Sequence, residues 1–165
     1  MITIRKGTSS DFKLIRDIAT KAWQNTYNSI LSKEQIAYML DLFYSDAIFK
    51  INILENEHQF LLAYQDNECL GFAAYQNQYK NQSVTRLHKI YLLPEAQIKG
   101  IGKALISTIE KSALENESHK ISLNVNRFNP SVAFYKKLGF TILTEENIDI
   151  GKGYLMEDYK MEKYL

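Results

Sequence analysis

The chain has 165 residues, of which 45% are hydrophobic and 12% aromatic, which is enough to fill the core of one domain and excludes a disordered chain. Its 20 lysines and arginines nearly balance 19 aspartates and glutamates, so the basic excess typical of a nucleic-acid-binding domain is absent. The single cysteine, Cys69, excludes an intrachain disulfide and has no cysteine partner for a zinc site.

The order of residues also predicts the compartment, the partners and the number of domains of the protein. Residues 1–6 lack the apolar segment of a signal peptide, and no apolar run approaches the ~20 residues that cross a bilayer. We therefore expect a cytoplasmic protein without a membrane, nucleic-acid or metal partner. No repeat, low-complexity tract or linker interrupts the sequence, which predicts a single domain over residues 1–165.

The chain begins with an expected strand and helix. Residues 2–5 alternate apolar and polar side chains, which is typical of a strand. Residues 12–23 place apolar side chains three, four and seven positions apart, which is typical of an amphipathic helix. Ser9 or Ser10 is in place to cap that helix.

Two further helices are expected before the middle of the chain. Ser32 and Gln35 have the spacing of a capping box, which predicts that a second helix begins there. Residues 48–54 have the periodicity of a third.

Strands are expected in the middle of the chain. Residues 60–64 and 70–76 are rich in apolar and aromatic side chains, and Asp66, Asn67 and Glu68 between them favour a hairpin turn. Residues 84–93 predict a further strand. Pro94 ends it, because proline has no N–H for a strand ladder.

Helices and strands alternate in the last third. A helix is expected over residues 100–114 and a strand over residues 121–125. Asn129 suits the cap of the next helix, Pro130 its first position, and Gly139 the position just past its end. The chain closes with two expected strands, at residues 140–147 and 154–164.

The segment from Gln97 to Gly102 lies between an expected strand and an expected helix. The first amides of a helix are unpaired and carry partial positive charge, so they can bind phosphate, and glycines let the backbone come close. An ordinary strand-to-helix turn explains the spacing equally well. Two other nucleotide loops are excluded, because Ala104 stands where one needs Ser or Thr and Leu105 where the other needs Gly.

Two blocks of residues together resemble the GNAT superfamily of N-acetyltransferases. Gln97-x-x-Gly100-x-Gly102 resembles its Gln/Arg-x-x-Gly-x-Gly/Ala motif. A second block resembles its later strand–helix–strand motif: Leu123-x-Val125, Asn129, Ala133-Phe134-Tyr135 and Gly139-Phe140. Gln97 in place of the commoner arginine, and Ile98 where glycine is frequent, are departures from the pattern.

The resemblance implies a fold and an activity. The fold would be α/β of the α+β type, with a mixed, mostly antiparallel sheet of about seven strands, four or five flanking helices, and a splayed fourth strand that carries a bulge. The activity would be acetyl-CoA-dependent N-acetylation of a primary amine of a small molecule, by direct attack in a ternary complex. No metal is implied.

The same resemblance assigns residues to the acetyl-CoA donor. The backbone of Leu92 and Leu93 would meet the pantetheine arm, and the Leu92 N–H would polarise the thioester carbonyl. Asn129 would reach the same arm, or would be a plain helix cap. The pyrophosphate would bind at Gln97, Ile98, Lys99, Gly100, Ile101, Gly102 and Lys103.

Catalytic roles are implied for two residues. Tyr135 stands where the family places a general acid for the departing thiolate, and a hydroxyl that titrates near ~10 can protonate a thiolate of ~8.5. The alternative for Tyr135 is a packed aromatic. His88, on the strand that leads into the bulge, would be the general base, or else a structural histidine. His58 is expected at the surface.

The acceptor site is expected to involve the helices near the N-terminus. Trp23 and Tyr27 could flank a cationic amine, or could pack in the core. Residues 23–45 and 153–159 faintly resemble polyamine acetyltransferase relatives. Glu157 and Asp158 could attract a polyamine, or could simply be solvated. The apolar end of the chain, with Leu155, Met156, Met161 and Leu165, fits a homodimer contact or a core strand.

Two other functions remain open. A protein or peptide N-acetyltransferase would need an open groove, whereas a small amine favours a closed, aromatic-lined pocket. A non-catalytic sensor of acyl-CoA would bind CoA without acetylating an amine.

Overall fold

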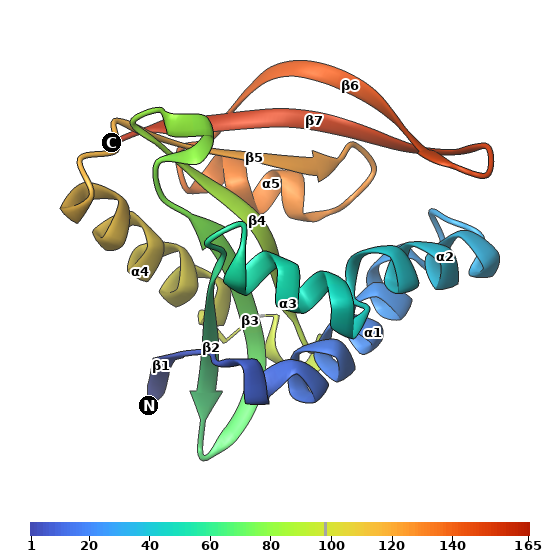
Figure 1. Cartoon of the computed structure of the whole chain (residues 1–165), viewed down its shortest axis with the longest axis horizontal. Helices are drawn as coiled ribbons and strands as arrows, with labels where there is room; N and C mark the ends of the chain where they lie inside the picture. Colours follow the sequence, from blue (N-terminus) through green and yellow to red (C-terminus); the bar gives the residue numbers. More distant parts are fainter. Residues whose placement is uncertain (98) are drawn as a thin grey trace.

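The computed structural model describes residues 1–97 and 99–165, and these form a mixed α/β domain (Figure 1). A seven-stranded sheet has the order β1-β2-β3-β4-β5-β7-β6, and only β4 and β5 pair in parallel. The expected fold is thus confirmed. The strands are β1 Ile2–Lys6, β2 Gln59–Gln65, β3 Glu68–Gln76, β4 Val84–Leu92, β5 Lys120–Asn126, β6 Thr141–Gly151 and β7 Tyr154–Tyr164. The helices are α1 Phe12–Tyr27, α2 Lys33–Phe43, α3 Asp46–Leu54, α4 Ile101–Glu115 and α5 Ser131–Lys137.

The two faces of the sheet carry different helices, with α4 on one side and α1 to α3 on the other (Figure 1). Alternate residues of β3 face each layer, as the pleat requires. The Tyr75 hydroxyl donates to Ser112 Oγ of α4 at 3.1 Å, whereas the Phe72 ring meets the Tyr44 ring after α2 at 6.3 Å. The core therefore has two halves, one on each side of the sheet.

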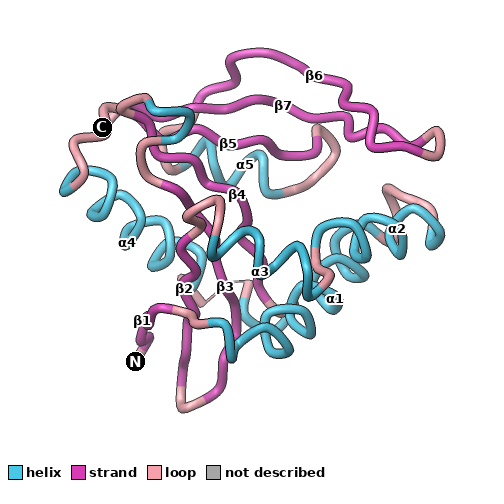
Figure 2. Tube along the Cα trace, viewed as in Figure 1, coloured by secondary structure: helices cyan, strands magenta, loops and turns pink. Residues whose placement is uncertain are grey.

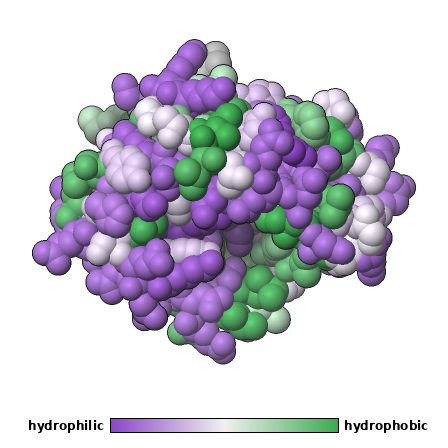
Figure 3. All heavy atoms as spheres, turned by 90° about the horizontal axis from the view of Figure 1, so that it is seen from above, coloured by the Kyte–Doolittle hydropathy of each residue, from purple (hydrophilic) through white to green (hydrophobic). Residues whose placement is uncertain are grey.

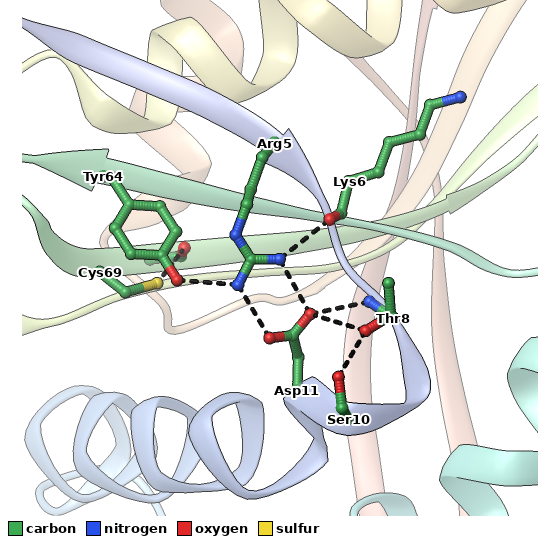
Figure 4. Close-up of polar contacts among 8 residues, drawn as sticks. Arg5, Lys6, Thr8, Ser10, Asp11, Tyr64 and Cys69 are labelled. Atoms are coloured by element: carbon green, nitrogen blue, oxygen red, sulfur yellow. Dashed lines mark hydrogen bonds and ion pairs between the residues drawn. The ribbon is translucent and has the colours of Figure 1, made fainter.

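The first helix begins differently from the sequence expectation. Thr8, rather than Ser9 or Ser10, precedes the short 3-10 turn that leads into α1, and its N–H donates to Asp11 Oδ2 at 2.8 Å. Arg5 of β1 donates to both oxygens of the Asp11 carboxylate, at 3.0 and 2.8 Å (Figure 4). The Arg5–Asp11 ion pair therefore determines which of three adjacent hydroxyl residues precedes the helical segment.

The start of α2 fulfils half of the expected capping box. Ser32 Oγ accepts the N–H of Gln35 at 3.1 Å, as a cap should. The Gln35 amide does not complete the box, because its Nε2 donates instead to the carbonyl of Leu155 in β7 at 3.1 Å. A cap residue thus also connects α2 to the far end of the chain.

The hairpin of β6 and β7 extends past the rest of the sheet towards α2 (Figure 2). Ile150 is the extra residue where the β6 register shifts between Asp149 and Gly151, and its carbonyl accepts the Tyr38 hydroxyl at 2.6 Å. The Tyr38 and Tyr154 rings lie 5.4 Å apart. These contacts hold α2 against the hairpin. Met161 of β7 is buried, which fits the core alternative, while Leu155 is exposed.

The fourth strand contains the expected bulge, and it lies at His88. Ala74 of β3 pairs with Lys89 and Tyr75 pairs with Leu87, so His88 has no partner of its own on β3. The parallel pairing of β4 with β5 ends at Leu87 and Leu123, although both strands continue. The two strands therefore splay apart beyond the bulge. None of the helices in the described residues is long and apolar enough to cross a bilayer.

Candidate active site

A cavity of about 720 Å³ occupies the splay between β4 and β5 and extends towards α1 and α2. Its wall combines the end of β4, the end of β5, the N-terminus of α4, the start of α5, and the C-terminal hairpin. The volume is in the range of small-molecule and cofactor sites. Seen from above, the protein surface is mostly hydrophilic and is hollowed near its centre (Figure 3).

The backbone of β4 offers free groups to this cavity. The Leu93 N–H donates to the Leu70 carbonyl of β3 at 2.8 Å. Hydrogen-bonded and non-bonded pairs alternate along an antiparallel ladder, so Leu92, and likewise Ile90, turn their N–H and C=O away from β3, towards the gap. The geometry favours Leu92, as expected, and adds Ile90. It disfavours Leu93, whose N–H is already used.

The N-terminus of α4 forms another wall of the cavity. Gly100 is the cap residue with a φ of 77°, a conformation that favours glycine. The amides from Gly100 to Lys103 have no partner within the helix, because they belong to its first turn. A Cβ on Gly102 would lie 3.1 Å from the Phe134 ring and 3.5 Å from Leu92 Cδ1. Gly102 therefore keeps a narrow space open, whereas Gly100 is needed for its backbone conformation.

The other predicted residues of this loop differ in position. Gln97 and Lys103 line the cavity, whereas Lys99 is exposed and its N–H donates to the Ala96 carbonyl at 3.2 Å. The Ile101 side chain is buried in the core, so only its backbone can meet a ligand. The predicted contact of Ile98 lies outside the described residues.

The Asn129 side chain connects the start of α5 to α1. Its Oδ1 accepts the N–H of Ser131 at 2.8 Å at the start of α5, and its Nδ2 donates to the Tyr27 hydroxyl at 3.1 Å. The bond to Ser131 fits the capping alternative, although Pro130, expected as the first helical residue, is itself the cap residue of α5. The same amide joins α5 to α1.

Tyr135 of α5 lines the cavity and is only 6% exposed. Its ring packs 5.4 Å from that of Phe134 and 5.8 Å from that of Phe140. Burial, followed by the nearby Tyr27, raises the pKa of Tyr135 far above its ordinary value. The hydroxyl is therefore protonated throughout the neutral range and can donate a proton to a strong base beside it.

Aromatic side chains make up much of the wall on the α1 side. Trp23 and Tyr27 both line the cavity and are buried, with ring centroids 4.9 Å apart. Two further aromatics complete the group: the Trp23 ring lies 6.3 Å from Tyr44 and 5.7 Å from Tyr91. Burial raises the pKa of Tyr27 to about 12.

His88 lies at the edge of the cavity in a crowded pair of histidines. Its ring stacks on that of His58 at 3.8 Å, and Nε2 is 3.0 Å from Gln76 Oε1. Burial, with smaller contributions from His58, Arg86 and Lys89, lowers the pKa of His88 to about 3. A neutral histidine is present at pH 7, but such a low pKa makes it a weak proton acceptor. His58 is not the free surface residue expected.

Three charged residues in the cavity wall carry the remaining chemistry. Lys89 lies with Nζ 4.8 Å from the Tyr44 ring centre, and burial lowers its pKa to about 8. Arg86 donates to Asn124 Oδ1 at 2.9 Å. Asp158 is buried at 4% exposure, so it is not the solvated residue that one alternative expected. The basic residues had no sequence signal beyond their place on the bulged strand.

Comparisons with known proteins agree with this geometry. The model of the family described as "Acetyltransferase (GNAT) family" matches residues 13–140. The spermidine N(1)-acetyltransferase of Thermoplasma acidophilum is 30% identical over 161 residues, which cover 94% of this chain and 96% of that relative. The N-acetyltransferase YuaI of Bacillus subtilis is 27% identical over 156 residues, which cover 91% and 86% of the two chains.

Solved structures show the same fold. The crystal structure of the PaiA N-acetyltransferase from Thermoplasma acidophilum in complex with coenzyme A has a TM-score of 0.84 and 29% identity, and the match covers 100% of this chain and 99% of that one. A GCN5-related N-acetyltransferase from Rhodopseudomonas palustris reaches a TM-score of 0.84 at 18% identity, over 99% and 95% of the two chains, which is likeness of fold alone.

Proposed function

The chain belongs to the GNAT family of acetyltransferases, and we propose that it transfers the acetyl group of acetyl-CoA to the primary amine of a small molecule, by direct attack in a ternary complex. The observation that carries the proposal is one continuous cavity. The β4–β5 splay and the first turn of α4 lie on one side of it. The other side is an aromatic chamber, lined by Trp23, Tyr27, Tyr44 and Tyr91.

The residues on the first side suit acetyl-CoA, which supplies an activated acetyl thioester. The amides from Gly100 to Lys103, which have no partner within the helix, can hold a pyrophosphate, and the space kept open by Gly102 admits it closely. The gap-facing groups of Ile90 and Leu92 can hold the amide-rich pantetheine arm, and the Leu92 N–H can polarise the thioester carbonyl.

Tyr135 is the residue we propose as general acid. It lies in the wall of the cavity on α5, and its raised pKa keeps the hydroxyl protonated at neutral pH. The same rise makes the hydroxyl a weaker acid, so the position in the cavity wall carries this assignment. His88 stays a prediction as the general base. Its pKa of about 3 weighs against that role, because a base works best when its pKa is near the working pH.

A small acceptor is favoured over a protein or peptide by two contacts between α2 and the C-terminal hairpin. The bond from Gln35 to Leu155 and the bond from Tyr38 to Ile150 connect α2 to the C-terminal hairpin above the chamber. A peptide would need an open groove through this position. Trp23 and Tyr27 would then flank the amine.

A polyamine is a second candidate, favoured by the similarity to the spermidine acetyltransferase of Thermoplasma acidophilum. The charges in the chamber favour a single ammonium group instead. Among the described residues of the wall, Asp158 is the only carboxylic acid, whereas Arg86 and Lys89 are cationic and would repel a second ammonium.

A panel of acceptors assayed with acetyl-CoA tests the proposal. We expect thiol release that depends on a small primary amine, with butylamine and putrescine as a matched pair, and little release with peptides that bear a free N-terminus or lysine. Binding of CoA without amine-dependent release from any acceptor would support the acyl-CoA sensor instead. Release with peptides alone would support a protein acetyltransferase.

A further inference from the structure

Asp158 lies at the end of the cavity that holds Tyr135. It belongs to β7, where it pairs with Asn126 at the end of β5, next to the β4–β5 splay. Its negative charge is close enough to Tyr27 that it adds to the effect of burial on the pKa of that hydroxyl. Tyr27 in turn influences Tyr135 in the same way. The carboxylate therefore lines the same cavity as the residue proposed to protonate the leaving sulfur.

The carboxylate of Asp158 is buried without a cation of its own. Its hydrogen bond, from Asn124 Nδ2 to Oδ2, is long at 3.4 Å. Asp158 takes no part in the ion pairs within 4 Å that the described residues form. A buried carboxylate without an ion pair is unusual, since desolvation of a charge is compensated by a partner in most proteins. A positively charged ligand would supply that partner.

Charged and polar groups face Asp158 from each element around it. Tyr27 approaches from α1, Arg86 from β4 and Asn124 from β5, while Glu146 lies across on β6 and Arg127 follows β5. Burial is the largest influence and raises the pKa of Asp158. The Asn124 hydrogen bond opposes it, and Glu146 raises the pKa whereas the two arginines lower it.

We infer that Asp158 binds the ammonium group of the acceptor and takes its proton before the nitrogen attacks the thioester. The inference rests on the proposed function and adds to it the general base and the charge of the group that enters. Asp158 differs from His88 in its charge and in its position. It is a charged partner for an ammonium group, and it lies beside Tyr27 rather than among the histidines at the bulge.

The protons are transferred in the following order. The ammonium gives one proton to Asp158, and the neutral nitrogen forms its bond to the acetyl carbon as the carbon–sulfur bond breaks. The departing sulfur takes the proton of Tyr135, which recovers one from the acetylated nitrogen, and Asp158 releases its proton to solvent. The amide nitrogen keeps one hydrogen, CoA leaves as a thiol, and one proton is released per turnover.

The burial of Asp158 makes the first transfer feasible. An alkylammonium titrates near ~10 in water and an aspartate near ~3.9, which is a large gap. Burial disfavours both charged forms, so it raises the pKa of the acid and lowers that of the amine. The gap therefore narrows when the amine enters the closed chamber.

The test compares Asp158→Asn, which removes the charge and keeps the shape, with Glu157→Gln, its neighbour on the same strand outside the cavity wall. The rate of amine acetylation is measured from pH 6 to pH 10, with the affinity for CoA and the melting temperature of each variant. We expect Asp158→Asn to lower kcat/KM for the amine by ~100-fold at pH 7, in the range of general base catalysis. Affinity for CoA and the melting temperature should not fall.

The pH profile separates a base from a structural residue. The asparagine variant should regain activity about tenfold for each unit of rising pH up to the pKa of the amine, because solvent then supplies the neutral form. The wild type should depend on pH less steeply. His88→Gln, tested in parallel, should cost less activity than Asp158→Asn.

Three results would overturn the inference. Activity of Asp158→Asn within a few-fold of wild type at pH 7 would remove the base role, and a loss that is equal at every pH would indicate a structural role. An equal loss in Glu157→Gln would show that the effect is not specific to the cavity. Amine-dependent release that Asp158→Asn retains rejects this inference alone, whereas no such release by the wild type rejects the proposed function and this role together.

Discussion

The Tyr38 hydroxyl on α2 donates a 2.6 Å hydrogen bond to the carbonyl of Ile150 in β6, 112 residues further along the chain. Ile150 is free to accept it because the bulge in β6 removes its carbonyl from the regular ladder with β7. A helix from the first quarter of the sequence and a hairpin from the last thus meet over the acceptor side of the cavity.

Replacing Tyr38 with phenylalanine removes this bond and keeps the packing on Tyr154. We expect KM for the small amine to rise about fivefold, the factor that corresponds to a hydrogen bond of ~1 kcal/mol. KM for acetyl-CoA should stay constant, because Tyr38 is remote from the α4 turn. Steady-state kinetics with each substrate varied in turn measure both values. An unchanged amine KM would show that the bond does not close the chamber.

Replacing Tyr135 with phenylalanine should lower kcat by ~100-fold or more, in the range of general acid catalysis, with little change in affinity for CoA. Because burial raises the pKa of Tyr135, the wild type should show no loss of activity from its ionisation up to pH 9. Thiol release across this pH range and calorimetric titration with CoA are the measurements. Tyr75→Phe, a hydroxyl on the α4 side, is the matched control. Equal turnover in Tyr135→Phe and wild type would exclude the acid role.

Replacing Gly102 with valine should fill the space between Phe134 and Leu92. The position is in the first turn of α4 and its φ is not in the left-handed region, so we expect the fold to persist and the affinity for CoA to drop by more than ~10-fold. Calorimetric titration with CoA checks this, beside a melting curve. Ser107→Val, on the exposed face of the same helix, should bind CoA normally. Normal binding by the Gly102 variant would move the pyrophosphate elsewhere.

Replacing Lys89 with methionine should stabilise the protein near pH 7. The folded pKa of about 8 is below the ordinary value of 10.5, so the folded state binds fewer protons than the unfolded state between these limits. Stability of the wild type therefore rises as pH increases from 8 to about 10.5, and the cost of the buried cation is fully present below 8. The melting temperature of Lys89→Met should exceed that of wild type by a few degrees at pH 7.

The difference between the two proteins should shrink as pH approaches 10, when Lys89 of the wild type has lost its charge in the folded state. Thermal unfolding by circular dichroism at pH 7 and pH 10 measures this. Lys111→Met, at an exposed position on α4, should show no such dependence. A gap that widens with pH would mean that the Lys89 charge is stabilised in the chamber.

Replacing Asp11 with asparagine should weaken the start of α1, because it loses the charged partner of Arg5 and a strong acceptor for the Thr8 N–H. The pKa of Asp11 is lowered, first by the hydrogen bond from Arg5, so its contribution is present above the unfolded pKa and lost as pH falls through the folded one. Partial exposure of Arg5 limits the effect to ~1 kcal/mol at pH 7.

Urea unfolding at pH 7 and at pH 3 measures this contribution, and the difference from wild type should diminish at the lower pH. Asp41→Asn removes a more exposed pair with Arg16, at 3.5 Å, and should have almost no effect. Equal stability of Asp11→Asn and wild type at pH 7 would show that the contacts in Figure 4 do not set the helix start.

The sequence was sufficient for the elements, and it also predicts the donor side of the site, because both depend on local patterns. Apolar patterns together with cap and turn residues located the five α-helices and seven strands of the described residues. Asp66 and Asn67 adopt the positive φ values of 50° and 65° that a tight hairpin needs. Gly100 and Gly102 take the positions expected from their motif. Where neighbouring residues are chemically alike, as at Thr8, Ser9 and Ser10, only the contact with Asp11 and Arg5 decides between them.

The residues proposed for the acceptor side could not be placed from the sequence. Their positions depend on the register of the strands, which no local sequence pattern determines. The bulge at His88 turns both His88 and Lys89 to the face of α1 to α3, and it brings His88 onto His58 from before β2. Glu157 and Asp158 are adjacent acids in the sequence. The sequence alone could not show whether either of them attracts a ligand or is simply solvated. The register of β7 on β5 then buries Asp158 and leaves Glu157 near Arg127.

The most direct test of the central claim is mass spectrometry of the acceptor after incubation with the protein and acetyl-CoA, with released thiol counted in the same sample. We predict one acetylated small amine for each thiol released, and neither product in the absence of the amine beyond background hydrolysis. Thiol release at the same rate without amine, or acetyl groups found only on peptides, would contradict the claim.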